Sequence, residues 1–168
     1  MKEVVEIHVR IATVEEMKKL WEYSDSPTYK YFVNGITSGN IEFWAVESIK
    51  EKKLIGELYI FWNSEDADEA DGVNRAYLCA FRIEEQFRGQ GLASKLMKAA
   101  LGRLKEKGFY EVTIGIDNEN HEKLKSMYNS WGFNELIKQQ HYDHHYLDIN
   151  NNPVYFEEPH DLYLKRLK

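Results

Sequence analysis

Cysteine is almost absent from this chain, since Cys79 is the single one among 168 residues. One thiol cannot form an intrachain disulfide, and it cannot build a cysteine-based zinc site. Cys79 falls inside a predicted strand, which favours a small buried hydrophobe over a nucleophile. The N-terminus lacks a signal-like apolar run, and no stretch approaches the roughly 20 apolar residues that span a bilayer. These absences predict a cytoplasmic protein that does not contact a membrane.

Positive charge is also scarce, because 22 Lys and Arg face 28 Asp and Glu, for a formal net charge of −6. A nucleic-acid-binding surface needs clustered Lys and Arg to neutralise phosphates, so the balance argues against a nucleic-acid partner. Hydrophobic residues at 43% and charged residues at 30% are typical of a globular protein. No repeat, low-complexity run or linker divides the sequence, and we predict one domain over residues 1–168.

Apolar periodicity and turn residues predict strands and helices in alternation. Strands are predicted at 4–11, 41–49, 54–62, 75–83, 109–116 and 161–167, with another beginning at 133. Helices are predicted at 13–23, with Thr13 and Glu16 as a capping box, at 91–107 and at 120–131. Segments 24–40 and 138–160 are predicted to be irregular, apart from a short helix near 29–33. We expect an α/β (α+β) fold with one mixed, mostly antiparallel twisted sheet of about six to seven strands and helices on both faces.

The most informative segment is FRIEEQFRGQGLA at residues 81–93, where a strand ends, glycines follow and a helix begins. A helix N-terminus carries unpaired N–H groups and partial positive charge. Gly89 and Gly91 lack Cβ atoms, so a phosphate can approach the backbone there, and Arg88 adds a charge. The segment therefore predicts pyrophosphate binding. A P-loop is excluded by the absence of GxxxxGK[ST]. A dinucleotide-binding turn remains an alternative, although Ser94 replaces its third small contact and only Glu111 supplies the distal acid.

Two motifs in order resemble the Gcn5-related N-acetyltransferase (GNAT) superfamily over nearly the whole chain. The first signature, [RQ]-x-x-G-x-[GA], is matched by Arg88–Ala93, with the apolar Ile83 five positions before the Arg. The second is a helix that ends in Tyr and a Gly-Phe stop, matched by Tyr128, Gly132 and Phe133. The chain departs from the family where an Asn usually precedes the Tyr by seven positions: His121 stands there, with Asn118 and Asn120 close by.

The resemblance implies that acetyl-CoA is the acyl donor. Backbone N–H groups of the glycine turn would bind the pyrophosphate, and the strand edge at 81–83 would pair with the pantetheine arm. A backbone N–H near Phe81 or Arg82 would polarise the thioester carbonyl. The implied donor-binding residues are Phe81, Arg82, Ile83, Arg88, Gly89, Gln90, Gly91, Leu92, Ala93, Ser94 and Asn120.

The implied reaction is direct transfer of an acetyl group to an amine, without an acyl-enzyme. Tyr128 is the candidate general acid for the CoA thiolate, because a phenol is protonated at neutral pH. Glu57, inside the apolar strand LIGELYIFW, is the candidate general base if burial raises its pKa. His121 and a water chain are alternatives, and Glu57 could instead face solvent or bind the acceptor.

The acceptor is predicted to be a small-molecule or peptide amine. The resemblance implies that its pocket is built from the variable segments 24–40 and 138–160. The aromatic residues of these segments that could form the pocket walls are Tyr29, Tyr31, Phe32, Tyr142 and Tyr146. His141, His144 and His145 are predicted to lie in a flexible surface loop near the acceptor rather than to bind a metal. The acidic run at 65–71 is predicted to be a solvated hairpin tip, with a lure for a polyamine or basic peptide as the alternative. A homodimer, a catalytically silent acyl-CoA sensor of the same fold and a dinucleotide-dependent oxidoreductase stay open.

Overall fold

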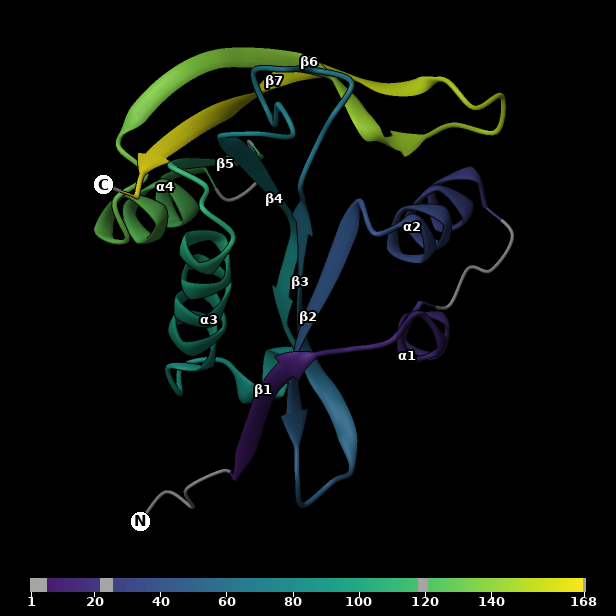
Figure 1. Cartoon of the computed structure of the whole chain (residues 1–168), viewed down its shortest axis with the longest axis vertical. Helices are drawn as coiled ribbons and strands as arrows, with labels where there is room; N and C mark the ends of the chain where they lie inside the picture. Colours follow the sequence, from purple (N-terminus) through teal and green to yellow (C-terminus); the bar gives the residue numbers. More distant parts are fainter. Residues whose placement is uncertain (1–5, 22–25, 118–120, 168) are drawn as a thin grey trace.

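The computed structural model describes residues 6–21, 26–117 and 121–167. Seven strands and four α-helices make up the described chain (Figure 1). In chain order they are β1 (Ile7–Ile11), α1 (Val14–Leu20), α2 (Pro27–Ser38), β2 (Ile41–Ser48), β3 (Lys53–Phe61), β4 (Arg75–Ile83), α3 (Leu92–Glu106), β5 (Glu111–Ile116), α4 (His121–Ser130), β6 (Glu135–Leu147) and β7 (Pro153–Arg166).

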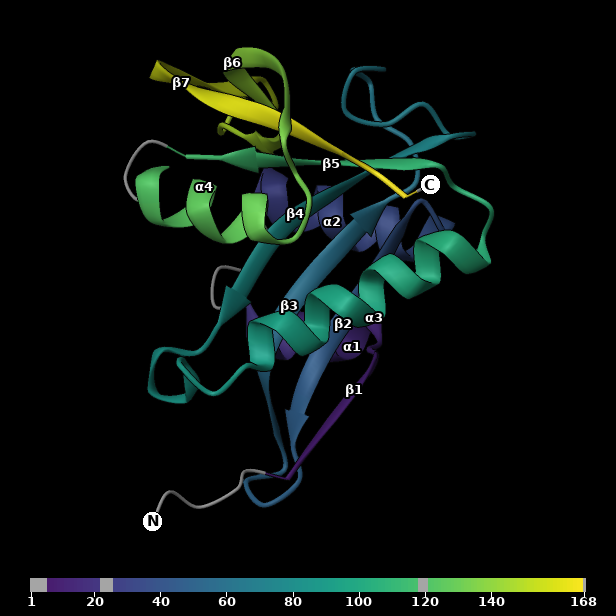
Figure 2. The same cartoon turned by 90° about the vertical axis from the view of Figure 1, so that its left-hand side faces the viewer.

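All seven strands form a single sheet with the order β1-β2-β3-β4-β5-β7-β6. Every neighbouring pair is antiparallel except β4 and β5, which are parallel and joined through α3. The parallel pairing covers Arg75–Leu78 on β4 and Glu111–Ile114 on β5, and it stops there. Beyond Leu78 the two strands diverge, as Figure 2 shows. The expected mixed, mostly antiparallel sheet is confirmed, and this separation opens it in the middle.

Helices cover both faces of the sheet, as predicted. In Figure 1, α3 and α4 lie on one side of the central strands and α1 and α2 on the other. Leu96, Ala100 and Leu104 form the buried stripe of α3 and are fully buried against the sheet. On the opposite face a mostly aromatic core gathers around Phe32 and Tyr59. The site described below lies between these two cores.

The first helix begins at its predicted cap. The side chain of Thr13 accepts the N–H of Glu16, and the carboxylate of Glu16 accepts the N–H of Thr13, so the capping box is present. The helix ends at Leu20, earlier than the predicted 23.

The prediction that segment 24–40 is mostly irregular was wrong, because α2 occupies twelve of its residues. Ser26 caps the helix by accepting the N–H of Tyr29, and Pro27 occupies the first turn, where its missing N–H costs nothing. The Asn-Gly pair that suggested a turn lies inside the helix. Gly35 is required there because a Cβ would overlap the side chain of Ile41.

The prediction that segment 138–160 is irregular was also wrong, because β6 and β7 cross it as one long hairpin. The register between the two strands shifts at three places, between Leu136 and Lys138, between Gln140 and Tyr142, and between Asp143 and Leu147. Such irregularities break the alternation of apolar and polar residues by which a strand is predicted. The hairpin places side chains of the predicted loop over the centre of the molecule.

Candidate active site

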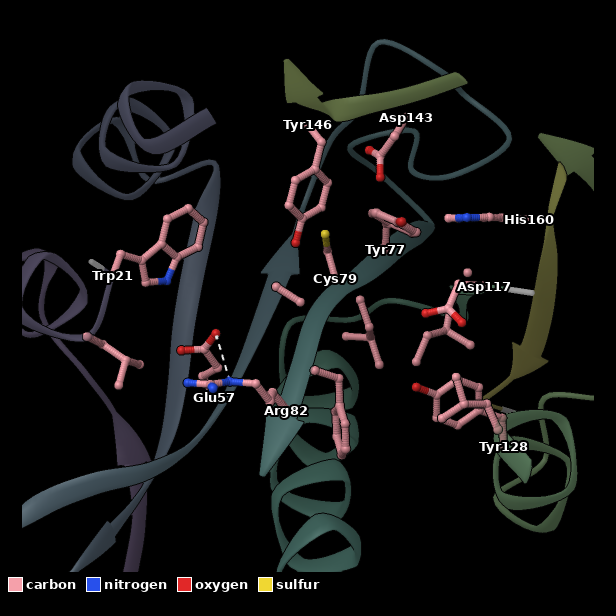
Figure 3. A pocket seen from close by; sticks show the side chains of 17 residues that line it. Trp21, Glu57, Tyr77, Cys79, Arg82, Asp117, Tyr128, Asp143, Tyr146 and His160 are labelled. Atoms are coloured by element: carbon pink, nitrogen blue, oxygen red, sulfur yellow. Dashed lines mark ion pairs between the residues drawn. The ribbon is translucent and has the colours of Figure 1, made fainter. Parts of the chain in front are cut away.

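A cavity of about 590 Å³ opens beside the point where β4 and β5 separate (Figure 3). Its walls come from both helical layers and from the β6–β7 hairpin. The lining residues are Leu20, Trp21, Glu57, Tyr77, Leu78, Cys79, Ala80, Phe81, Arg82, Ile114, Gly115, Asp117, Leu124, Tyr128, Asp143, Tyr146 and His160. The two predicted catalytic side chains, Glu57 and Tyr128, are among them and lie on opposite sides of the cavity (Figure 3).

A bulge in β4 shapes one wall. Glu57 on β3 pairs with Arg82, but Tyr59, two residues on, pairs with Cys79, so β4 carries an extra residue between these positions. Ala80 there adopts a left-handed conformation with φ of 53°, which is unfavourable for a residue with a Cβ. A bulge re-aims the backbone and side chains around it. The predicted donor residues Phe81 and Arg82 follow directly and line the cavity.

Glu57 is buried in the cavity wall, with an exposed fraction of 7%. Its Oε1 lies 3.9 Å from the Nε of Arg82, while its buried Oε2 has no hydrogen-bond partner. Burial raises the pKa of Glu57 to about 7, and the charge of Arg82 opposes this shift only in part. The expectation that Glu57 could face solvent was therefore wrong, and its carboxylate is suited to exchange a proton near neutral pH.

Tyr128 lies on α4 on the opposite side of the cavity, 4% exposed. Its ring packs against Phe81, Trp131 and Phe133, with centroid distances of 6.5, 6.0 and 6.2 Å. Figure 3 shows its hydroxyl directed into the cavity. Burial raises the pKa of Tyr128 above its ordinary value, so the phenol keeps its proton throughout the physiological range.

The glycine turn between β4 and α3 has the conformation that its sequence predicts. Gly89 and Gly91 have φ of 80° and 77°, and nothing lies within 4 Å of the place where a Cβ would stand on either. Gly91 caps α3 without a side-chain hydrogen bond, so no side chain occupies the first N–H groups of the helix. The Nε of Arg88 donates to the carbonyl of Ile83 at 2.8 Å and ties the turn to the end of β4. Donor binding by these residues stays a prediction.

The acceptor side is built differently from its prediction. His145 is fully buried rather than part of a flexible surface loop. Its Nε2 lies 2.9 Å from Oε1 of Glu69, and its Nδ1 lies 3.2 Å from the hydroxyl of Tyr31. Glu69 belongs to the acidic run predicted to be solvated, yet it is 2% exposed. Sequence reasoning missed this pair because its members lie 76 positions apart and no local pattern connects them.

Cys79 is buried, as predicted, and burial raises the pKa of its thiol well above the ordinary value. Within residues 6–21, 26–117 and 121–167, no three His, Cys, Asp or Glu side chains gather as ligands for a metal ion. In the same part of the chain, no helix is long and apolar enough to cross a membrane.

Comparison with known proteins places this arrangement in a family. Residues 2–133 match the model of the acetyltransferase (GNAT) family. The chain belongs to the GNAT family. N-alpha-acetyltransferase 30 of Schizosaccharomyces pombe is 36% identical over 59 residues, which are 35% of this chain and 39% of that protein. The chain thus matches well under half of the length of this curated relative.

Solved GNAT structures share the fold across the whole chain. A GNAT acetyltransferase of Staphylococcus aureus Mu50 has a TM-score of 0.67 at 14% identity, covering 97% of this chain and 100% of its own. Arabidopsis thaliana NAA60, in complex with a bisubstrate analogue, has a TM-score of 0.65 at 18% identity, covering 96% and 98%. Escherichia coli YhbS, in complex with CoA, has a TM-score of 0.62 at 15% identity, covering 100% and 85%. At these identities the likeness shows the fold alone.

The position where this GNAT chain departs from the family pattern lies at the start of α4. His121 does not line the main cavity: its Nε2 lies 2.6 Å from Oδ2 of Asp161, and both residues line a second, smaller cavity. The alternative of His121 as general base therefore lacks support from geometry. Asn118 and Asn120, predicted to assist donor binding, lie outside the described residues.

Proposed function

We propose that this GNAT chain transfers the acetyl group of acetyl-CoA directly to a primary amine. The observation that carries the proposal is the placement of Glu57 and Tyr128 on opposite sides of one cavity, where β4 and β5 separate. One group can accept a proton near neutral pH and the other holds a proton to donate. Amine acetylation needs both, because the attacking nitrogen loses a proton and the leaving sulfur gains one.

The fit of the residues to a CoA donor supports this assignment. The open space beside Gly89 and Gly91 lets a phosphate approach the backbone, and the uncapped N–H groups at the start of α3 favour negative charge there. Beyond Leu78, the edge of β4 is no longer paired to β5, so it can accept an extended arm. The GNAT relatives YhbS, solved with CoA, and NAA60, solved with acetyl-CoA, support the same donor.

The proposed step forms a C–N bond and breaks a C–S bond. The amine nitrogen attacks the thioester carbonyl, whose oxygen is stabilised by a backbone N–H beside the bulge at Phe81. The proton of the amine passes to the carboxylate of Glu57, and the hydroxyl proton of Tyr128 passes to the departing thiolate. Cys79 takes no part, because burial keeps its thiol protonated and no acyl-enzyme is needed.

Two other hypotheses account for less of the site. A silent acyl-CoA sensor needs neither a buried carboxylate with one oxygen free of hydrogen bonds, as in Glu57, nor a phenol facing the cavity. A dinucleotide-dependent oxidoreductase is disfavoured by the GNAT family match and by the position of the glycine turn after the fourth strand of the sheet.

Binding and turnover test the proposal separately. Acetyl-CoA at 100 times its Kd should stabilise the fold by about 2.7 kcal/mol, seen as an upward shift in Tm, whereas NADH should give none. Release of free CoA should then depend on added amine, across a panel of alkylamines, diamines, amino acids and short peptides. A protein that binds acetyl-CoA but releases no CoA with any amine is the sensor. A protein without a thermal shift at millimolar acetyl-CoA lacks the proposed donor site.

A further inference from the structure

The part of the cavity away from the glycine turn is lined by more negative than positive charge. Three carboxylates line the cavity, Glu57, Asp117 and Asp143, and the permanent cation among the lining side chains is Arg82. Arg82 is 55% exposed and is the cation that lies near Glu57. The Oε2 atom of Glu57 is buried without any hydrogen-bond partner, which is costly unless a ligand supplies a donor. The cavity therefore favours a ligand with positive charge and N–H donors.

Asp143 is one of the carboxylates that line this cavity, and hydrogen bonding fixes its side chain there. Its Oδ1 accepts the backbone N–H of His145 at 2.9 Å. His145 is itself fixed, since its ring is fully buried between Glu69 and the hydroxyl of Tyr31. Both ring nitrogens of His145 are therefore held, Nδ1 by the hydroxyl of Tyr31 at 3.2 Å and Nε2 by Oε1 of Glu69 at 2.9 Å. The side chain of Asp143 is thus positioned before any ligand arrives.

The surroundings of Asp143 suit an organic cation. Tyr77 and Tyr146 line the same part of the cavity, and Figure 3 shows both near Asp143, with Glu57 beyond Cys79. Aromatic rings attract a cation over their faces, which adds to the attraction of a carboxylate. Burial raises the pKa of Asp143, and the nearby His145 ring and the backbone N–H groups of His145 and Tyr146 oppose this shift only in part. Two acidic positions, one at the proposed base and one at a distance from it, match a molecule with two amino groups, of which the distal one stays cationic while the reacting one releases its ammonium proton to solvent before it attacks.

The hairpin that carries Asp143 is also tied to the helical layer beside it. The N-terminal part of α2 is tied to the end of β6, where the N–H of Leu147 donates to Oγ1 of Thr28 at 2.8 Å and that hydroxyl donates back to the carbonyl of Leu147 at 3.2 Å. Figure 1 shows the hairpin reaching over α2. This contact holds the hairpin in place beside α2, and the cavity of about 590 Å³ is of the size that binds a small molecule.

We infer that Asp143 is a specificity-determining residue that binds the second cationic group of a small diamine acceptor, while the first amine reacts beside Glu57. The inference rests on the proposed function and adds the substrate class to it. Its prediction is a preference of the protein for diamines over monoamines of equal length, and this preference should depend on Asp143.

The test compares putrescine and cadaverine with butylamine and pentylamine, at saturating acetyl-CoA, for the wild type, Asp143→Asn and Glu157→Gln. Glu157 is exposed on β7 of the same hairpin, so its variant loses the same charge away from the cavity. In the wild type, kcat/KM for the diamines should exceed that for the monoamines by about tenfold or more, as for a charge-assisted hydrogen bond. Asp143→Asn should bring this ratio close to one, and Glu157→Gln should keep it.

Equal kcat/KM values for diamines and monoamines in the wild type would overturn the inference, as would an equal loss for both in Asp143→Asn. Faster acetylation of a peptide N-terminus, unaffected by Asp143→Asn, would also overturn it. Binding of the same amines to the CoA complex, measured by calorimetry, separates this failure from that of the proposed function. A diamine preference in binding that Asp143→Asn removes, without any turnover, would uphold the inference and reject catalysis. The binding comparison within the wild type requires no variant to fold.

Discussion

The two sides of the cavity differ in the groups that they present, backbone on one side and side chains on the other. The side toward α3 and the end of β4 presents backbone: a glycine turn, an uncapped helix start and a strand edge released from pairing. The side toward α2 and the β6–β7 hairpin presents side chains, among them Asp143, Tyr146 and the buried His145 behind them. In the proposed function, the backbone groups bind the part that every CoA donor shares, and the side chains select the acceptor. The difference teaches where changes of sequence should alter chemistry and where they should alter selectivity.

The largest effect should come from Glu57, the proposed general base. Glu57→Gln keeps the size of the side chain but cannot accept the proton of the amine, so kcat should fall by roughly 10³-fold, within the usual range for a general base. Steady-state rates at saturating substrates measure this change. Glu15→Gln, on the exposed face of α1, is the matched control and should keep wild-type kcat. A loss smaller than about threefold would assign proton removal to water instead.

Replacing Tyr128 should give the second largest loss of kcat. Tyr128→Phe removes only a hydroxyl, so acetyl-CoA affinity should persist while kcat drops by about 10²-fold, the lower end for a general acid. Measurement needs saturating acceptor, so that binding does not hide the chemical step. Tyr155→Phe, at an exposed position, serves as control. If stability falls in step with activity, the hydroxyl of Tyr128 has a structural role.

Breaking the buried His145–Glu69 pair should weaken acceptor binding without weakening donor binding. His145→Ala leaves the carboxylate of Glu69 without its ring partner, and unfolding should become easier by about 2 kcal/mol. Acceptor KM should rise, whereas the thermal shift produced by acetyl-CoA should remain. Denaturant titration and the two KM values report these changes. His141→Ala, on the exposed part of the same strand, should change neither; an equal loss of donor affinity in His145→Ala would show that the two sides are coupled.

The pH profile should report Glu57 directly. Its pKa lies at about 7, so below this pH the base is protonated and kcat/KM should fall tenfold per pH unit. The contribution of Glu57 to stability changes with pH in the opposite direction to kcat/KM. The folded-state pKa is raised above the ordinary 4.5, so this group's contribution is fully present below about 4.5 and is lost as pH rises through 7. Glu57→Gln should therefore lack the acid limb of the rate profile. Its free energy of unfolding should also fall less than that of the wild type between pH 4.5 and pH 8. An acid limb that persists in Glu57→Gln would point to another titrating group.

The smallest effect is expected for alanine in the glycine turn, compared with alanine at a glycine that ends another helix. Gly91→Ala and Gly39→Ala both place a Cβ at positive φ in open space, so each should cost about 1 kcal/mol of stability. Only Gly91→Ala should also raise KM for acetyl-CoA, because only this Cβ faces the proposed phosphate position. Thermal melts and donor KM values provide the comparison, and equal donor KM in both variants would place the pyrophosphate elsewhere.

This contrast also explains what the sequence could reveal. The donor side follows local rules, so the glycine turn, the stripe of α3 and the strand before it could be predicted from adjacent residues. The acceptor side depends on distant partners: Thr28 meets Leu147 across 119 positions, and His145 meets Glu69 across 76. Register shifts in β6 interrupt its alternation of apolar and polar residues. Gly35 lies in a helix, where a Cβ would overlap Ile41, yet in the sequence the Asn-Gly pair looks like a turn. Such signals exist only once the chain has folded.

The indole of Trp21 gives the cavity an optical property of its own. It lines the acceptor side, and its Nε1 donates to the hydroxyl of Tyr59 at 3.0 Å. Trp131 lies on the donor side, with its ring 6.0 Å from that of Phe81. Indole emission responds to the polarity and quenching groups around the ring. The chain has two further tryptophans, Trp44 and Trp62. Replacing these two and keeping either Trp21 or Trp131 would therefore give each substrate its own fluorescence signal, and the order in which the substrates bind could be followed without a label.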